Sequence, residues 1–268
     1  MGADRGCSGS NAVKISLTGG RHASKGEVSV IHLEKGKYVV RQAQGPVDIV
    51  SMQSLRASCF GVRDDWDDFD ARSTHILIED RATGVLVCCY RLLALSGCDL
   101  PQSYAAQFYD LNALQNYPGL MAELGRFCVS AAHSDPDILR VAWAAMTEFV
   151  DTRGVQLLFG CSSFAGIQAE DYLDAFAMLR ARHLAPVCWA PQIRAPEVFA
   201  YAAQLEHKPD AKKAMLAMPP LLRTYLLMGG WVSDHAVVDH HMNTLHVFTG
   251  LEISAIPASR KRLLRALV

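Results

Sequence analysis

The amino-acid sequence predicts an α/β protein of the mixed α+β kind, in which helices flank a central mixed sheet. Stretches with the helical period of apolar residues alternate with apolar runs of strand length along the 268 residues. Half of the residues are hydrophobic and 20% are charged, as is ordinary for a globular domain. A chain of this length buries a full core, so we expect one large domain with an extension.

The composition divides the chain into three parts. Residues 1–26 are rich in glycine, serine and small polar residues, and we expect this N-terminal segment to be mobile. Residues 27–190 carry the pattern of the predicted core. Residues 191–268 are expected to form a C-terminal extension that packs on this core.

Charge and sorting signals argue against several classes of protein. The net charge of −1 implies no nucleic-acid partner. No apolar run reaches the length of a membrane span, and residues 1–10 lack the apolar core of a signal peptide. We therefore expect a cytoplasmic protein. Its eight cysteines include no Cys-x-x-Cys pair, which favours free thiols in a reducing compartment.

The first half of the chain predicts a strand, a helix and a hairpin. Residues 37–43 have strand character, and a glycine-proline pair begins a helix over residues 45–60. Residues 74–78 and 85–95 form the two strands of a plausible hairpin.

Residues 121–129 are a charged strand in an apolar setting. Strict alternation would place Leu124 and Arg126 on one side of this strand, and Glu123 and Phe127 on the other. Because buried charges are costly unless they are paired or used, Glu123 and Arg126 indicate a candidate site.

The second half of the chain alternates in the same way. A helix begins at Asp135-Pro136, where aspartate is a good N-cap, and Gly154 ends it. An apolar strand over 155–161 stops at a pair of serines, and a helix over 169–182 follows. Beyond these come an irregular proline-punctuated stretch (186–196), a helix (221–228), two extended segments (231–238 and 245–253) and a basic tail (260–265).

A series of residues in fixed order resembles that of known enzymes. The series is Arg56, Phe60, Trp66, Asp67, Asp70, Arg91, Phe108, Glu123, Arg126 and Phe127. It resembles the acyl-homoserine-lactone synthases and, more closely, the L-ornithine N-α-acyltransferases, both of which have the GNAT-like acyltransferase fold. The stretches 67–78 and 158–164 and the long C-terminal segment favour the ornithine branch.

The resemblance implies an N-acyltransferase that moves a (3-hydroxy)acyl chain from acyl carrier protein to the α-amine of L-ornithine, giving lyso-ornithine lipid. It implies the carrier-protein thioester as co-substrate and no cofactor. Two alternatives stay open: an acyl-homoserine-lactone synthase, and a non-catalytic module that binds lipid or acyl carrier.

N-acylation requires a neutral amine, because an ammonium group has no lone pair for attack. A group that accepts the proton is therefore needed, and Glu123 is the best candidate, directly or through a water. The alternative is that Glu123 only forms a salt bridge to Arg126 or Arg91 inside the sheet.

The resemblance also implies a cationic amino acid as acceptor. Arg56, Arg91 and Arg126 are candidates for binding its carboxylate, and Asp67 and Asp70 for binding its side-chain ammonium. The alternative is a structural ion-pair network that braces the N-terminal helix.

Aromatic and hydroxyl side chains complete the candidate site. Phe60, Trp66 and Phe108 either line an acyl channel or belong to the core. Ser163 either supports the leaving thiolate or bonds the backbone at a turn. Backbone N–H groups near Val129 are candidates for stabilising the oxyanion.

Residues 131–136 favour a carrier protein over coenzyme A as the donor. GNAT enzymes that use coenzyme A place a glycine-rich loop here, whose N–H groups bind the pyrophosphate. This loop has no glycine, Pro136 donates no N–H, and Asp135 would repel a phosphate. Arg180 and Arg182 are candidate contacts for the acidic carrier protein, or else simply a solvated helix end.

Two further features concern metals and membranes. Four histidines between residues 235 and 246 match no familiar ligand spacing, so we expect no metal site. The basic tail, with its interleaved leucines, is either a solvated end or a peripheral contact with the inner face of the membrane.

Overall fold

A large sheet and a set of covering helices make up the computed structural model, which describes residues 31–266. The expected mobile segment 1–26 lies outside these residues. The first half of the sheet contains β1 (His32–Lys35), β2 (Tyr38–Gln42), β3 (Thr74–Asp80), β4 (Leu86–Leu95) and β6 (Leu120–Val129). The second half contains β7 (Val155–Ala165), β9 (Val198–Phe199), β10 (Trp231–Val232), β11 (Ala236–Asp239) and β12 (Thr244–Glu252). A separate small pair is formed by β5 (Tyr109–Asp110) and β8 (Gln192–Ile193). The helices are α1 (Pro46–Phe60), α2 (Pro136–Arg153), α3 (Leu173–Arg182), α4 (Tyr201–Gln204), α5 (Ala211–Ala217), α6 (Pro220–Leu227) and α7 (Ala258–Arg265).

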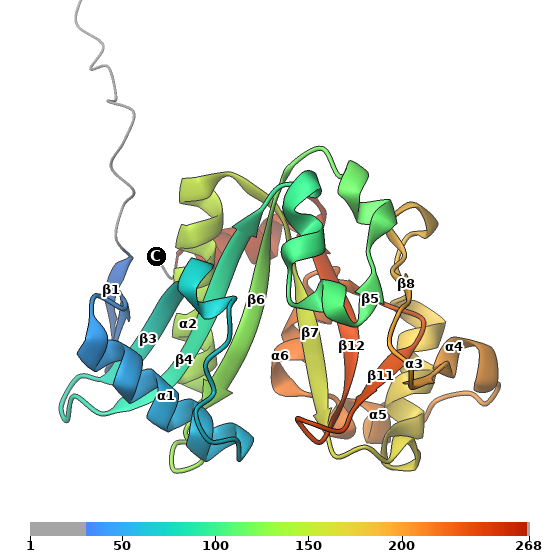
Figure 1. The fold of residues 1–268 in the computed structure, drawn as a ribbon, viewed down its shortest axis with the longest axis horizontal. Helices are drawn as coiled ribbons and strands as arrows, with labels where there is room; N and C mark the ends of the chain where they lie inside the picture. The colour runs from blue at the N-terminus through green and yellow to red at the C-terminus, as the bar shows by residue number, and fades with distance from the viewer. Residues whose placement is uncertain (1–30, 267–268) are drawn as a thin grey trace, which may run out of the picture.

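The ten strands of the large sheet follow the order β1-β2-β3-β4-β6-β7-β12-β11-β9, with β10 paired to β12. All of these pairs are antiparallel except β6 and β7, which run parallel. Helices α1 and α2 cover opposite faces of the first half (Figure 1). The predicted mixed sheet flanked by helices is therefore confirmed.

Local sequence explains where the two covering helices begin and end. Helix α1 begins at Pro46, which has no N–H to leave unpaired in the first turn, and ends at Gly61 with φ 69°. The Asp135 carboxylate caps α2 by accepting the Asp137 N–H, and Gly154 ends α2 with φ 67°. The buried stripe of α2 packs on the sheet in the main hydrophobic core.

Strands β6 and β7 pair only near their beginnings and then separate toward the lower edge of Figure 1. The last paired residues are Leu124 and Gly160. A Cβ atom on Gly160 would lie 2.3 Å from the Leu124 carbonyl oxygen, so only glycine permits this close approach. We call the point where β6 and β7 separate, directly after Leu124 and Gly160, the fork. Strand β12 pairs along nearly the whole of β7 and thus extends the sheet on the β7 side of the fork.

A β-bulge on β6 lies directly after the fork. Cys89 pairs with Cys128 and Arg91 with Gly125, so β6 carries one more residue than β4 between these pairs. The extra residue is Arg126, whose φ of 52° lies in the left-handed region.

The bulge reverses the alternation of side chains along β6. Phe127 packs in the same hydrophobic cluster as Leu124, against α2, while Cys128 packs on the opposite face with residues of α1. The strict alternation expected from the sequence is therefore wrong beyond Gly125. The inserted residue lets Arg126 reach the aspartates on the face that Glu123 occupies.

Several other elements differ from expectation. Strand β7 continues through the serine pair to Ala165, because β12 offers it a partner there. The extended segment 231–238 is divided into β10 and β11, and the irregular stretch 186–196 contains β8. The basic tail is helical, as α7.

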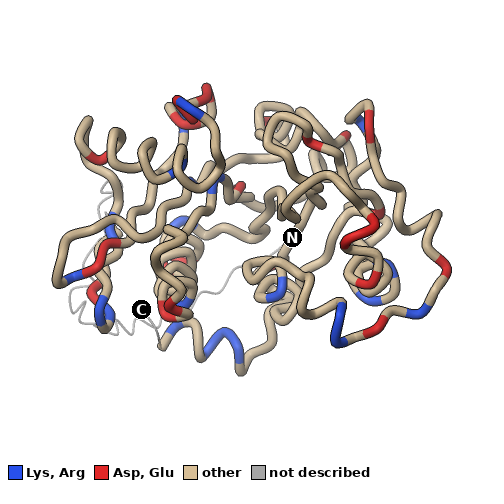
Figure 2. Tube along the Cα trace, turned by 90° about the horizontal axis from the view of Figure 1, so that it is seen from below, with Lys and Arg blue, Asp and Glu red and all other residues tan. Residues whose placement is uncertain are grey.

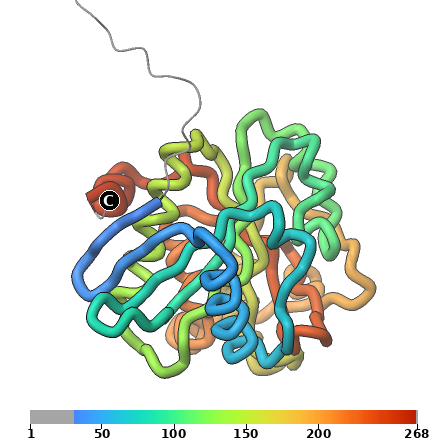
Figure 3. The backbone as a smooth tube through the Cα atoms, turned by 60° about the vertical axis from the view of Figure 1, so that its left-hand side comes forward, coloured from blue at the N-terminus to red at the C-terminus, as the bar shows by residue number. Residues whose placement is uncertain are grey.

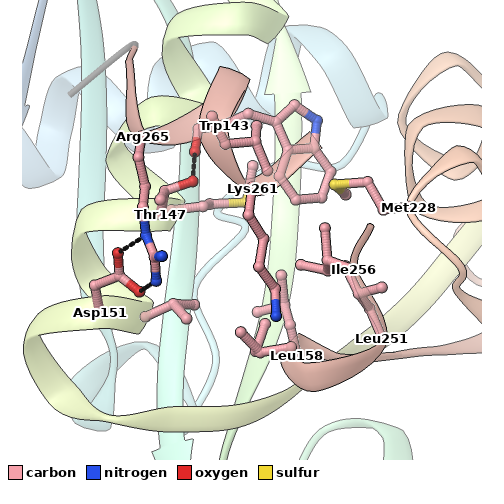
Figure 4. A pocket seen from close by; sticks show the side chains of 13 residues that line it. Trp143, Thr147, Asp151, Leu158, Met228, Leu251, Ile256, Lys261 and Arg265 are labelled. Atoms are coloured by element: carbon pink, nitrogen blue, oxygen red, sulfur yellow. Dashed lines mark hydrogen bonds and ion pairs between the residues drawn. The ribbon is translucent and has the colours of Figure 1, made fainter. Parts of the chain in front are cut away.

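Helix α7 folds back beside the N-terminal strands, as the tube in Figure 3 shows. Its Arg265 forms an ion pair with Asp151 of α2, with 2.9 Å between Nε and Oδ2. A pocket of only about 40 Å³, lined mainly by apolar side chains, lies between α2, β12 and α7 (Figure 4). Within residues 31–266, no helix has the length and apolar character needed to cross a bilayer.

Candidate active site

The separated strands enclose a cleft of about 560 Å³. One wall is the part of β6 that includes the bulge, and the other is β7 from Gly160 to Ala165. Residues 219–222 at the start of α6 and residues of β11 and β12 complete the lining. This volume suits a small ligand, whereas the pocket beneath α7 does not, so the cleft is the candidate active site.

Glu123 is buried beside the fork and is held by backbone donors. Its Oε2 accepts the N–H of Tyr104 at 2.8 Å, and its Oε1 accepts the N–H of Ala105 at 2.7 Å. Only 4% of the residue is exposed. Burial raises the pKa of Glu123 to about 7, although the two N–H groups act in the opposite direction. The group can therefore exchange a proton near neutral pH.

No ion pair joins Glu123 to Arg91 or Arg126 in the described part of the chain, because both arginines bond to aspartates. The salt bridge offered as the alternative role for Glu123 is thus not formed. The pKa of Glu123 is set mainly by burial and by the backbone N–H groups at the start of the 3₁₀ turn at 105–107.

Three arginines interlock with three aspartates from the segment that follows α1. The ion pairs are Arg56–Asp70 (2.9 Å), Arg56–Asp65 (3.9 Å), Arg91–Asp70 (2.9 Å), Arg91–Asp67, Arg126–Asp65 (3.0 Å) and Arg126–Asp67 (3.2 Å). Burial opposes the charge of Asp70, but the hydrogen bond from Arg56 and the nearby Arg91 lower its pKa to about 2. The structural network offered as an alternative is therefore present, and its formal charges balance.

The cleft contains four of the predicted site residues. Phe60, Arg91, Arg126 and Ser163 line it. The other predicted residues lie outside its lining: Glu123, which is buried beside the fork, Arg56, Trp66, Asp67, Asp70 and Phe108, and, on α3, Arg180 and Arg182. Their roles toward a substrate or carrier protein stay predictions.

Some of these residues have clear structural surroundings. Trp66 is 41% exposed and packs against His75, with 5.8 Å between ring centroids. Phe108 packs edge-on against His246 at 4.9 Å. The Nε of Arg180 donates to a backbone carbonyl near α4 at 3.0 Å.

Tyr104, Asp239 and His246 are among the cleft residues that were not predicted as site residues. The Tyr104 ring lies 5.0 Å from the Arg126 guanidinium and covers the arginine–aspartate network. No local motif marks these residues, because they reach the cleft only through the covering loop and the pairing of β12 with β7.

Three histidines of the C-terminal extension each bond a different side chain. His235 bonds Asp234, His240 bonds Glu197, and His246 bonds Tyr109. Within residues 31–266, no group of three or more His, Cys, Asp or Glu side chains is arranged to hold a metal ion.

A sheet that forks between two parallel strands, with a buried carboxylate beside the fork, is typical of acyltransferases of the GNAT type. In agreement, the family description "Acetyltransferase (GNAT) domain" matches residues 53–144, from α1 into α2.

Two relatives identify the family more closely. The chain is 29% identical over 238 residues to the L-ornithine N(alpha)-acyltransferase of Rhodobacter capsulatus, which covers 82% of this chain and 91% of the relative. It is 32% identical over 203 residues to the enzyme of the same name from Rhizobium meliloti, which covers 72% of this chain and 68% of the relative. The chain belongs to the L-ornithine N(alpha)-acyltransferase family.

A solved structure is also similar. FeeM, an N-acyl amino acid synthase from uncultured soil microbes, is 11% identical with a TM-score of 0.46. The match covers 81% of this chain and 91% of FeeM.

Proposed function

We propose that this protein transfers an acyl chain from an acyl carrier protein thioester to the α-amine of L-ornithine. The observation that best supports this proposal is the buried Glu123 beside the fork, whose pKa is raised to about 7. The membership of the chain in this family agrees with it. The neutral amine attacks the thioester carbonyl, and Glu123 accepts its proton directly or through a water. An amide C–N bond forms, the C–S bond breaks, and the proton passes to the leaving thiolate.

The fork supplies donors for the tetrahedral intermediate. Beyond Leu124 and Gly160 the two strands no longer pair, so backbone groups on the β7-facing edge of β6 lack strand partners there. These groups lie along the cleft wall that ends at Val129. N–H groups held in this way stabilise an oxyanion without reorganisation.

The N-terminus of α2 supports the carrier protein as donor. Asp135 caps the helix with its own carboxylate and also pairs with Lys37 at 2.7 Å. The end of the helix that would bind a pyrophosphate thus already carries an anion. A carrier-protein thioester brings a single phosphate, and it needs no such site.

Arg180 and Arg182 remain the proposed contact for the carrier protein. Seen from below, basic and acidic residues are scattered along the trace in Figure 2, rather than gathered into one basic face. We also retain, as a proposal, that the protein is cytoplasmic and that its basic helix α7 makes peripheral contact with the anionic inner face of the membrane.

The test is incubation with one acyl chain on carrier protein or on coenzyme A, with either ornithine or S-adenosylmethionine as acceptor. Mass spectrometry should find acyl-ornithine, formed faster from the carrier protein, and this reaction should weaken as salt rises. Formation of acyl-homoserine lactone from S-adenosylmethionine would identify the protein as the alternative enzyme. No product from any pair of donor and acceptor would indicate a non-catalytic binding module. Equal use of coenzyme A without a salt effect would overturn the donor assignment.

A further inference from the structure

One carboxylate in the cleft lies outside the arginine–aspartate network. Asp239, at the end of β11, lines the cleft and is only 7% exposed. Its Oδ1 accepts the Met242 N–H at 3.0 Å. Within residues 31–266 no lysine or arginine forms an ion pair with it. A buried carboxylate of this kind is costly unless a cation compensates it.

His246 lies beside Asp239 on the same face of the sheet. Val237, two residues before Asp239, is the antiparallel partner of His246, and Ser163 is its partner on β7. Residues two apart on a strand share a face, so the side chains of Ser163, His246 and Asp239 share the face of the sheet that borders the cleft.

The hydrogen bonds of His246 determine its tautomer. The Tyr109 hydroxyl donates its only hydrogen to the His246 carbonyl oxygen at 2.8 Å, and it lies 3.1 Å from the ring Nδ1. Nδ1 must therefore carry a hydrogen that the hydroxyl oxygen accepts. In the neutral ring, Nε2 then holds a lone pair. No described residue bonds this buried nitrogen.

The ring does not supply the missing cation. Burial lowers the pKa of His246 to about 4, although Asp239 acts in the opposite direction. The imidazole is therefore neutral near pH 7. The formal charge near the cleft is thus balanced in the arginine network but left negative at Asp239.

We propose that Asp239 and His246 form the site for the side-chain ammonium group of the acceptor amino acid. Asp239 supplies the compensating charge, and the His246 Nε2 lone pair accepts a second N–H from the ammonium. The acceptor carboxylate then lies toward Arg126 on the opposite wall, and the α-amine lies between the walls at the fork. This inference rests on the proposed function and adds the residues that select a cationic acceptor.

Asp67 and Asp70 were the sequence-based candidates for this role. Each already bonds two arginines, and neither lines the cleft. Asp239 differs in both respects, which is why the structure favours it.

The test compares ornithine with norvaline, which has the same carbon chain without the terminal amine. Asp239→Asn keeps the Met242 hydrogen bond and removes the charge. It should lower kcat/KM for ornithine roughly tenfold to a hundredfold and leave norvaline within about twofold. The matched control is Asp234→Asn, because Asp234 is an exposed acidic residue outside the cleft lining. This variant should leave the ratio of kcat/KM for ornithine to that for norvaline unchanged.

His246 provides an independent pair of variants. His246→Gln retains an acceptor near the position of Nε2, whereas His246→Leu does not. Both variants lose the bond between the ring Nδ1 and the Tyr109 hydroxyl and keep the backbone carbonyl that this hydroxyl donates to, so their difference isolates the acceptor. The leucine variant should lose roughly tenfold in kcat/KM for ornithine, and the glutamine variant should recover most of it.

Each outcome decides the question. The assignment is overturned if Asp239→Asn lowers kcat/KM equally for ornithine and norvaline. It is also overturned if Asp67→Asn, and not Asp239→Asn, lowers the ratio of kcat/KM for ornithine to that for norvaline. A changed preference between 3-hydroxyacyl and plain acyl donors, with the acceptor ratio intact, would place the donor chain at Asp239. If Asp239→Asn does not fold, the His246 pair decides alone. A wild-type enzyme that does not acylate ornithine would refute the proposed function, not this site specifically.

Discussion

Replacing Glu123 by glutamine separates the roles of its charge and its hydrogen bonds. Each carboxylate oxygen now accepts one backbone N–H, from Tyr104 and from Ala105. Glutamine can satisfy one of these donors, but its amide hydrogens face the other. One buried N–H is left without an acceptor, at a cost of about 1–3 kcal/mol in the free energy of unfolding.

The charge of Glu123 has the opposite effect, and that effect depends on pH. The pKa rises from 4.5 to about 7 on folding, so the folded state binds the proton more tightly than the unfolded state. The stability gained in this way is fully present below about pH 4.5 and is lost as the pH rises through 7. At 1.36 kcal/mol per pKa unit, the difference amounts to ~3 kcal/mol. Glutamine does not titrate and lacks this loss.

Denaturant unfolding at pH 5 and pH 8 measures both effects. The variant should be less stable than the wild type at pH 5, and the difference should shrink or reverse at pH 8 by about 2–3 kcal/mol. Turnover should fall by roughly a hundredfold or more at neutral pH, and the wild-type rise in rate near pH 7 should disappear. Near-wild-type turnover would remove Glu123 from proton transfer. A stability difference that does not change with pH would refute the raised pKa.

Two further predictions concern stability. Asp70→Asn removes the fully buried carboxylate that Arg56 and Arg91 share, leaving Arg56 only Asp65 and Arg91 only Asp67, and should lower the free energy of unfolding by about 3–5 kcal/mol, measured in urea at pH 7. In the wild type, the contribution of Asp70 is present above pH 3.8 and is lost as the pH falls through about 2, so an acid titration in which both proteins unfold together would contradict it. Gly160→Ala places a methyl group 2.3 Å from the Leu124 carbonyl oxygen and should force the fork apart, with a melting temperature lower by several degrees; an unchanged melting temperature would show that the strands can shift freely.

The elements with strong local signals were predictable from the sequence. Helix α2 has an aspartate N-cap, a first-turn proline and a terminal glycine, and the structure places it where the sequence does. Strand β6 was likewise identified as a charged strand. Its bulge was not predicted, because the alternating pattern alone does not show that Arg126 is an inserted residue.

The candidate site was predictable only on one side of the cleft. Glu123, Arg126 and the aspartates before β3 lie in or near motifs whose charge in an apolar setting is unusual. Asp239 and His246 belong to ordinary extended segments. Their position depends on β12 pairing with β7 from far along the chain, and no local pattern encodes such a pairing.

The pairing of β12 with β7 also determines when the molecule can be completed during synthesis. Strand β7 ends at Ala165, but the strand that covers its outer edge begins only at Thr244. A nascent chain must therefore carry a long, largely apolar open edge while the segment between them emerges from the ribosome. A protein truncated before Thr244 would keep this edge exposed permanently, and it should aggregate instead of surviving as a weakly active core.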